Sequence, residues 1–308
     1  MFPIDISCLY PESFAPCDLY KKVEADEFVF FAQKSIPFNT MVKEVLWENG
    51  TNTLYIQTND IDHYFNYINN ELTQLVKNPA VKSEKKAEAV YSSCKIIMNK
   101  VFEDPRATFI NNACDLITPT VDLIISNDQA TRHLIKLTAH DHYTYVHSTN
   151  VGIFSIALAR IFFGANSSHD MQRLGVGFFL HDLGKCKLPL EILNKPGALT
   201  LEERQVVNRH PEDGSTLLRE SGYATEEAEI IILQHHERDN GTGYPNGLKG
   251  SDIHPYARIC RLADVYEALT SERPYHKKRT TFEALKLIKE VMDDLDQDLI
   301  NCFIKLFV

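Results

Sequence analysis

The sequence predicts a mainly helical protein with a small α+β segment, strands followed by helix, at its N-terminus. Two strand-like pieces lie within the first 60 residues, at 27–32 and 53–57, and from about residue 61 the apolar residues recur at helical spacing. Beyond about residue 125, every element that the pattern resolves is a helix. Because 308 residues are enough for two domains, we expect one domain at 1–125 and a second at 126–308.

The N-terminal elements follow in order from local signals. The turn 48–52 contains the dipeptide Asn49-Gly50, which predicts a turn between two hairpin arms. Tyr64, Ile68 and Leu72 then share one face of a predicted helix. Further helical runs are expected at 84–103 and over most of 107–140.

The C-terminal elements are marked by caps and by a Gly-rich interruption. Thr200 and Glu203 match a capping box, so a helix is expected from there to His210. Another helix is expected to begin at Thr225 and to reach the His235-His236 pair. Five Gly and Pro residues within 241–250 predict a loop, and helices are expected after it at 257–270, 281–293 and 297–307.

Composition narrows the class of protein. A hydrophobic content of 44% indicates a globular protein with a substantial core, and a net charge of −10 argues against a nucleic-acid binder. The N-terminus does not match a signal peptide, and the longest apolar stretch, Val151 to Phe163, is interrupted by Arg160 and too short for a bilayer. The seven scattered cysteines resemble reduced thiols. We therefore expect a cytoplasmic protein without membrane insertion.

A set of His and Asp side chains has the composition of a metal site. The set is His147, His181, Asp182, His210, His235, His236 and Asp264. Imidazole and carboxylate hold iron, manganese or zinc, and the absence of a thiol disfavours an iron–sulfur cluster or a zinc ribbon. Such a set points to metal-activated hydrolysis.

The alternative is that these histidines are ordinary core residues. A single His in an apolar stretch usually is one, and His181 with Asp182 could form a structural hydrogen bond. However, this pair follows the apolar run 174–180, and burying it without partners would be costly. A metal ion is the simpler partner. The adjacent His235 and His236 point about 100° apart on a helix, so they are expected to have different roles.

Several ordered motifs resemble the HD-GYP family, a branch of the HD superfamily of metal-dependent phosphohydrolases. The resemblance covers about 138–308 and rests on seven segments: 143–148, His181-Asp-Leu-Gly-Lys185, Leu193-Asn-Lys-Pro-Gly197, His210-Pro211, His235-His-Glu237, Gly243-Tyr-Pro245, and 263–265 through 271–275. It implies an all-helical domain that hydrolyses cyclic di-GMP with a hydroxide bridged between metal ions, often iron.

The resemblance also implies roles for individual residues. His147, His181, Asp182 and Asp264 match the superfamily's metal set, with Asp182 placed to bridge, and His210, His235 and His236 match the additional ligands. Lys185, on the face of His181 if the helix continues, and Arg273 match phosphate contacts. The alternatives are that Lys185 is a solvated charge at a helix end and that Arg273 forms a structural salt bridge. Tyr244 could contact the substrate or cap the core.

Four positions depart from the family pattern. Tyr143 replaces the Glu that helps to hold a third metal, so we expect two, most simply Fe with Mn as the alternative. Asn240 replaces an Asp but keeps an acceptor suited to a turn. His276 replaces a basic residue, and Glu267 replaces an Asp outside the metal set.

Two other functions stay open. Asn240 and His276 would suit a metal-containing cyclic-dinucleotide sensor of low or no activity, which would signal to a protein partner through the N-terminal domain or the loop 241–250. An HD hydrolase of another cyclic nucleotide is the second. A nuclease is disfavoured because the chain has no basic stripe.

Overall fold

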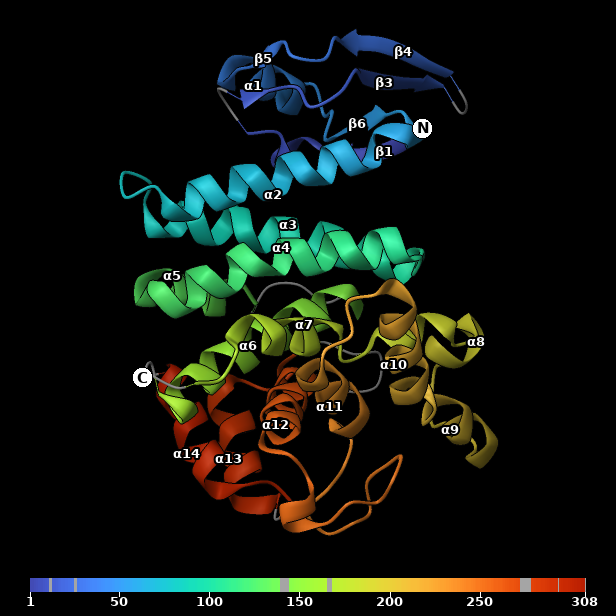
Figure 1. The fold of residues 1–308 in the computed structure, drawn as a ribbon, viewed down its shortest axis with the longest axis vertical. Helices are drawn as coiled ribbons and strands as arrows, with labels where there is room; N and C mark the ends of the chain where they lie inside the picture. The colour runs from blue at the N-terminus through green and yellow to red at the C-terminus, as the bar shows by residue number, and fades with distance from the viewer. Residues whose placement is uncertain are drawn as a thin grey trace.

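The computed structural model describes residues 1–10, 13–24, 27–138, 144–164, 168–271, 278–292 and 294–307. An antiparallel sheet forms one end of the molecule, and successive layers of helices lead from it to the opposite end (Figure 1). The predicted fold class, a mainly helical chain that begins with a small α+β segment, is confirmed.

The N-terminal sheet has four strands in the order β1-β6-β3-β4. Its strands are β1 (Phe2–Asp5), β3 (Leu19–Glu24), β4 (Glu27–Ala32) and β6 (Thr53–Ile56). Phe2 pairs with Ile56, and Tyr20 pairs with Phe30 on one side and with Tyr55 on the other. The small strands β2 (Ser13–Phe14) and β5 (Pro37–Phe38) form a separate ribbon.

The turn predicted between hairpin arms at 48–52 is wrong. It joins helix α1 (Thr40–Glu48) to strand β6, whereas the hairpin of the sheet is β3–β4. Asn39 caps the start of α1 by accepting from the Val42 N–H, and Gly50 follows its end with φ +67°. An Asn-Gly pair therefore serves here as a helix C-terminus, because a left-handed glycine ends a helix as readily as it reverses a strand.

Four helices connect the sheet to the C-terminal half. They are α2 (Ile61–Lys77), α3 (Ser83–Glu103), α4 (Ala107–Ser126) and α5 (Asp128–Leu137), close to the predicted ranges. α3 and α4 pack on each other. Both also contact helices of the C-terminal half, α3 with α6 and α4 with α7. Because one buried apolar cluster extends through these layers, the division at residue 125 stays a prediction.

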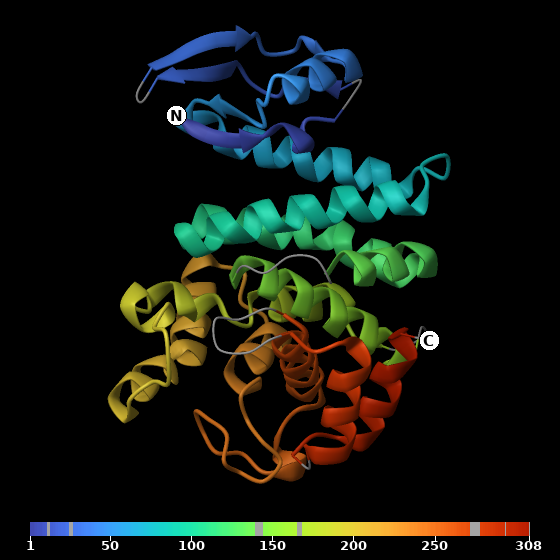
Figure 2. The same ribbon diagram turned by 180° about the vertical axis from the view of Figure 1, so that it is seen from behind.

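Among the described residues of the C-terminal half, the regular elements are helices, joined by loops. Its helices are α6 (Thr144–Phe163), α7 (Met171–Leu180), α8 (Leu190–Leu193), α9 (Leu201–Val207), α10 (His210–Ser221), α11 (Glu226–Gln234), α12 (Pro255–Thr270), α13 (Thr281–Val291) and α14 (Gln297–Ile304). The capping box of Thr200 and Glu203 is present, but its helix ends at Val207, so His210 begins the next helix instead. Figure 2 shows the loop between α11 and α12 at the end of the molecule away from the sheet.

Helix α6 is longer than its apolar stretch suggested. Among the described residues, it is the one helix apolar and long enough to cross a membrane, through the window Val146–Phe163. Of that window, 78% is buried inside the protein, where α6 packs against α3, α7 and α12. It is therefore built as a core helix. All seven cysteines are free, as expected.

Candidate metal centre

The predicted metal ligands come together from the ends of four helices and the middle of a fifth. His147 lies in the first turn of α6, His181 and Asp182 follow α7, and His210 begins α10. His235 and His236 follow α11, and Asp264 lies within α12. Two groups result, each with its ligand atoms within 4.8 Å of one another: Asp182, His210, His235 and His236 in the first, and His147, His181 and Asp264 in the second.

Asp182 stands between the two groups. Its Oδ1 lies 3.3 Å from His210 Nε2 and 3.7 Å from His235 Nε2. Its Oδ2 lies 3.5 Å from the Nε2 atoms of both His147 and His181. Each carboxylate oxygen thus faces a different group, which is the arrangement of a bridging ligand.

Three of the histidines are oriented by backbone carbonyls. His181, His210 and His235 each direct Nδ1 to the carbonyl oxygen three residues earlier, at 2.9, 2.8 and 2.8 Å. A carbonyl oxygen can only accept, so Nδ1 carries the proton and Nε2 presents a lone pair to the centre. This second contact is what usually sets the tautomer of a metal-ligating histidine.

His147 is oriented by a carboxylate instead. Its Nδ1 donates to Glu267 Oε2, while its Nε2 lies 3.2 Å from Asp264 Oδ1. The other oxygen of Glu267 accepts from Asn150 Nδ2 at 3.3 Å and from the Ser271 hydroxyl at 2.6 Å. The sequence predicts that Glu267 lies outside the metal set, and it did not identify this contact with His147. Glu267 follows Asp264 by three residues and so shares its helix face, and this spacing could have indicated that Glu267 lies beside the metal ligands.

The arrangement of donors fits divalent metal ions. Among the described residues, His181 Nε2 and Asp182 Oδ1 are buried without a hydrogen-bond partner. The Nε2 atoms of His210 and His235 are 3.3 Å apart, although both present lone pairs. Acceptors that face one another inside a protein are costly unless a cation lies between them. Imidazole nitrogens and carboxylate oxygens suit iron, manganese or zinc.

The ionisation of three of the buried ligands also suits metal binding. Burial lowers the pKa of His235 to about 4 and that of His236 well below its usual value, so both rings are neutral at pH 7. Burial alone would raise the pKa of Asp182, but Lys185 and the histidines hold it well below the usual range. Asp182 is therefore a carboxylate.

His235 and His236 have different surroundings, as their adjacency predicts. His236 does not share the carbonyl contact of His235; its Nδ1 lies 4.0 Å from Asp264 Oδ2, so the two groups adjoin. The ring of Tyr244 stacks on His236, with centroids 4.7 Å apart and an angle of 30° between planes. Tyr244 thus lies beside the metal centre and not in a remote core.

The surroundings of Lys185 correct one expectation. After α7 the chain continues as a 3-10 helix, Leu183–Lys187, so Lys185 does not extend the face of His181. Its Nζ donates to Asp182 Oδ2 at 2.5 Å, and its side chain is 21% exposed. The ammonium group therefore lies at the mouth of the centre. Arg273, Tyr143 and His276 lie outside the described residues.

The Gly-rich loop is held by Glu237, a residue whose role the sequence did not reveal. Its carboxylate is fully buried and accepts from the backbone N–H groups of Asn246 at 2.7 Å and Leu248 at 2.9 Å. Asn240 keeps the turn role that its side chain predicts, since its Oδ1 accepts from the Thr242 N–H and hydroxyl.

Known proteins resemble this chain over most of the metal-ligand region. A family model described as HD domain matches residues 130–299. A cyclic di-GMP phosphodiesterase of Pseudomonas aeruginosa is 35% identical over 222 residues, which cover 71% of this chain and 53% of that protein. A cyclic di-GMP phosphodiesterase response regulator of Xanthomonas campestris is 47% identical over 39% of this chain and 32% of its own length.

Two further comparisons concern the substrate and the fold. A 3'3'-cGAMP-specific phosphodiesterase of Vibrio cholerae is 33% identical over 50% of this chain and 30% of its own length. An HDG"Y"P protein from Bdellovibrio bacteriovorus has the same fold, with a TM-score of 0.70 and 23% identity over 99% of this chain and 98% of that one. This chain therefore spans about half or less of the length of the three phosphodiesterases but nearly all of the solved structure.

Proposed function

The chain belongs to the HD domain family, in its HD-GYP branch, and on that premise we propose that it hydrolyses a phosphodiester bond of cyclic di-GMP at a centre of two divalent metal ions. We propose iron as the metal, with manganese as the alternative. The two relatives named cyclic di-GMP phosphodiesterases support this substrate.

The two oxygens of Asp182 carry the proposal of two metals. One faces His210 and His235, the other faces His147 and His181, and lone pairs converge on both sides. His236 and Asp264 complete the two groups. A single ion would leave one set of buried acceptors without a cation.

Metal ions bound there would supply a hydroxide nucleophile near neutral pH and polarise the phosphodiester. The side chains around them have separate tasks. We assign Lys185 and Arg273 to the phosphate oxygens, since fixed cations favour the charge that develops in the transition state. Tyr244, stacked on His236, would meet the substrate at the rim of the centre.

A different cyclic dinucleotide is the second candidate substrate. The Vibrio relative named a 3'3'-cGAMP-specific phosphodiesterase is 33% identical to this chain, only slightly less than the Pseudomonas relative. A competition assay with both cyclic dinucleotides separates these candidates, because the true substrate would be hydrolysed with the higher kcat/KM.

We further propose that residues 1–125 form a regulatory segment for the catalytic part. They carry the sheet and the helices α2 to α4, while none of the seven predicted metal ligands lies among them. Either this segment or the loop 241–250 would contact a protein partner.

The test is hydrolysis by protein loaded without oxygen with Fe(II), and separately with Mn(II). We expect turnover of cyclic di-GMP that is lost in Asp182→Ala and retained in His63→Ala, a control that removes an exposed histidine of α2. Bound metal is measured in parallel. Two metals per chain without turnover of either cyclic dinucleotide would refute the enzyme and favour a sensor.

A further inference from the structure

The neck of the Gly-rich loop lies against helix α12. The chain leaves α11 through Glu237 and Asp239 and returns through Lys249 and Gly250. The two sides of this neck meet where the Gly250 N–H donates to the Asp239 carbonyl at 3.1 Å and where Asn240 bridges to Lys249. The loop is therefore closed on itself, and its position depends on what fastens the neck to the rest of the protein.

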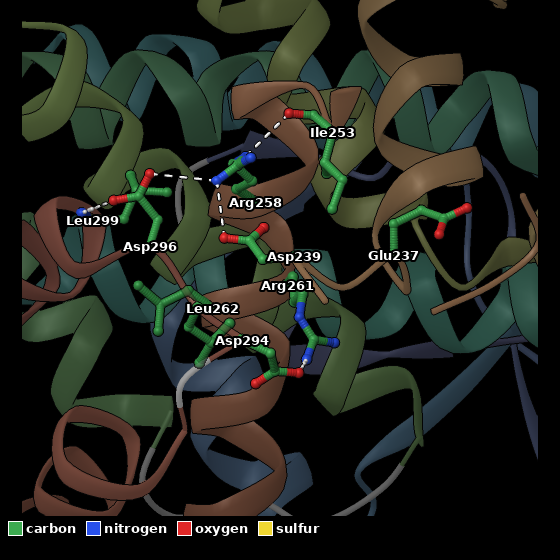
Figure 3. Close-up of a pocket in the computed structure, with 10 residues that line it drawn as sticks. Glu237, Asp239, Ile253, Arg258, Arg261, Leu262, Asp294, Asp296 and Leu299 are labelled. Atoms are coloured by element: carbon green, nitrogen blue, oxygen red, sulfur yellow. Dashed lines mark hydrogen bonds and ion pairs between the residues drawn. The ribbon is translucent and has the colours of Figure 1, made fainter. Parts of the chain in front are cut away.

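Arg258 of α12 contacts both sides of this neck. Its Nη1 lies 3.2 Å from Asp239 Oδ2 on the outgoing side, and Nη2 donates to the Gly250 carbonyl on the returning side. Its Nε donates to the Ile253 carbonyl at 3.0 Å. Figure 3 shows the guanidinium between Asp239 and Asp296, the latter at 3.6 Å just before α14.

We propose that Arg258 is a positioning residue, which fastens the loop so that Tyr244 stays over the metal centre. Tyr244 is carried by this loop and stacks on His236, while Glu237 holds the loop from inside through two backbone N–H groups. Arg258 and the ligand Asp264 share α12, so the same helix fixes both the loop and one side of the centre. The link to substrate rests on the proposed function.

Only an arginine matches this set of partners. All three guanidinium nitrogens are used, toward two carbonyl oxygens and two carboxylates, and the side chain is 16% exposed. Lysine offers one compact ammonium in place of a planar fork and cannot reach both sides of the neck together. Arg258→Lys keeps the charge and should still release the loop.

Arg261 provides a matched control one turn further along α12. Its guanidinium pairs with Asp294 at 2.5 Å, and its side chain is 8% exposed. Figure 3 shows this pair in the same pocket as Asp239 and Arg258, and Asp294 also lies 3.8 Å from Arg238 Nε. Arg261→Lys therefore changes a buried ion pair of similar kind in the same pocket while leaving the hydrogen bonds of Arg258 to Asp239 and Gly250 in place. Asp239→Asn, at a partly exposed position, removes the charge of one partner of Arg258 but keeps an acceptor, with less risk to folding.

The test is hydrogen exchange of the Mn(II)-loaded protein, read in peptides that cover 240–250, together with KM and kcat for cyclic di-GMP. We expect exchange of the loop amides at least about tenfold faster in Arg258→Lys, a smaller increase in Asp239→Asn, and no change in Arg261→Lys. KM should rise at least about fivefold while kcat stays within about twofold, because the metal ligands are untouched.

The proposal that Arg258 fastens the loop would be overturned if loop exchange in Arg258→Lys stayed within about twofold of wild type, or if Arg261→Lys accelerated it equally. A loosened loop with an unchanged KM would overturn its role in positioning. If the loop exchanges faster but neither the variants nor the wild-type protein turn over cyclic di-GMP, the role of Arg258 in fastening the loop is supported and the proposed substrate is refuted.

Discussion

Replacing Glu267 by Gln should weaken one metal site and spare the other. The carboxylate accepts from His147 on Oε2 and from Asn150 and Ser271 on Oε1. Gln keeps one oxygen, so it can serve His147 or the two opposite donors, but its amide nitrogen then faces a donor on the other side. His147 loses either its partner or the rigidity of that partner.

The expected loss follows from the number of contacts that Glu267 makes. Removing a partner that orients a metal-ligating histidine typically costs about 10- to 100-fold in metal affinity, or roughly 1.4 to 2.7 kcal/mol. Glu267 is only 3% exposed, and Asn150 and Ser271 fix the carboxylate that orients His147, so the upper half of that range is expected. The loss should fall on the group of His147, His181 and Asp264, because Glu267 orients His147, which belongs to that group.

The assay is a Mn(II) titration of metal-free protein against a competing chelator. Wild type should bind two ions, and Glu267→Gln should retain one at wild-type affinity while the second weakens by about 30-fold or more. Ser271→Ala, which removes one contact of Glu267 but none of His147, should change affinity by less than about threefold. Equal weakening of both ions, or of neither, would refute the assignment of Glu267 to a single site.

Three further outcomes are expected. Gly184→Ala should lower the free energy of unfolding by roughly 3 kcal/mol and reduce bound metal, since a Cβ there would lie 1.9 Å from the His210 carbonyl oxygen; urea unfolding and metal analysis test this. Burial lowers the His235 pKa from 6.5 to about 4. The stability that the neutral ring contributes is therefore complete above pH 6.5 and is lost as the pH falls toward 4. Because Gln does not titrate, the Tm of the metal-free protein should drop less from pH 7 to pH 5 in His235→Gln than in wild type. Thr200→Ala removes the capping box with Glu203 and should cost about 1 kcal/mol by the same unfolding measurement, with metal content unchanged.

Local signals predicted the helices well and their ends less well. The periodicity of Tyr64, Ile68 and Leu72 predicts α2, and these side chains are buried as expected. The capping signal predicts a helix that ends at His210, whereas in the structure His210 begins the next helix after a break at 208–209. The start of the new helix is a matter of packing, because the backbone of His210 lies so close to Gly184 that a Cβ there would be 1.9 Å from the His210 carbonyl oxygen.

The sequence by itself determined the helical class and the family to which the chain belongs, and it predicted the metal ligands as a set, because these depend on residue type, order and spacing. Only the tertiary structure decided that Asp182 faces a different group with each oxygen, and that Glu267 supports His147 from 120 residues away. It also decided that Arg258 fastens the loop neck. These contacts join segments that are distant in the chain, and their geometry is set by how the helices pack, which no local pattern encodes.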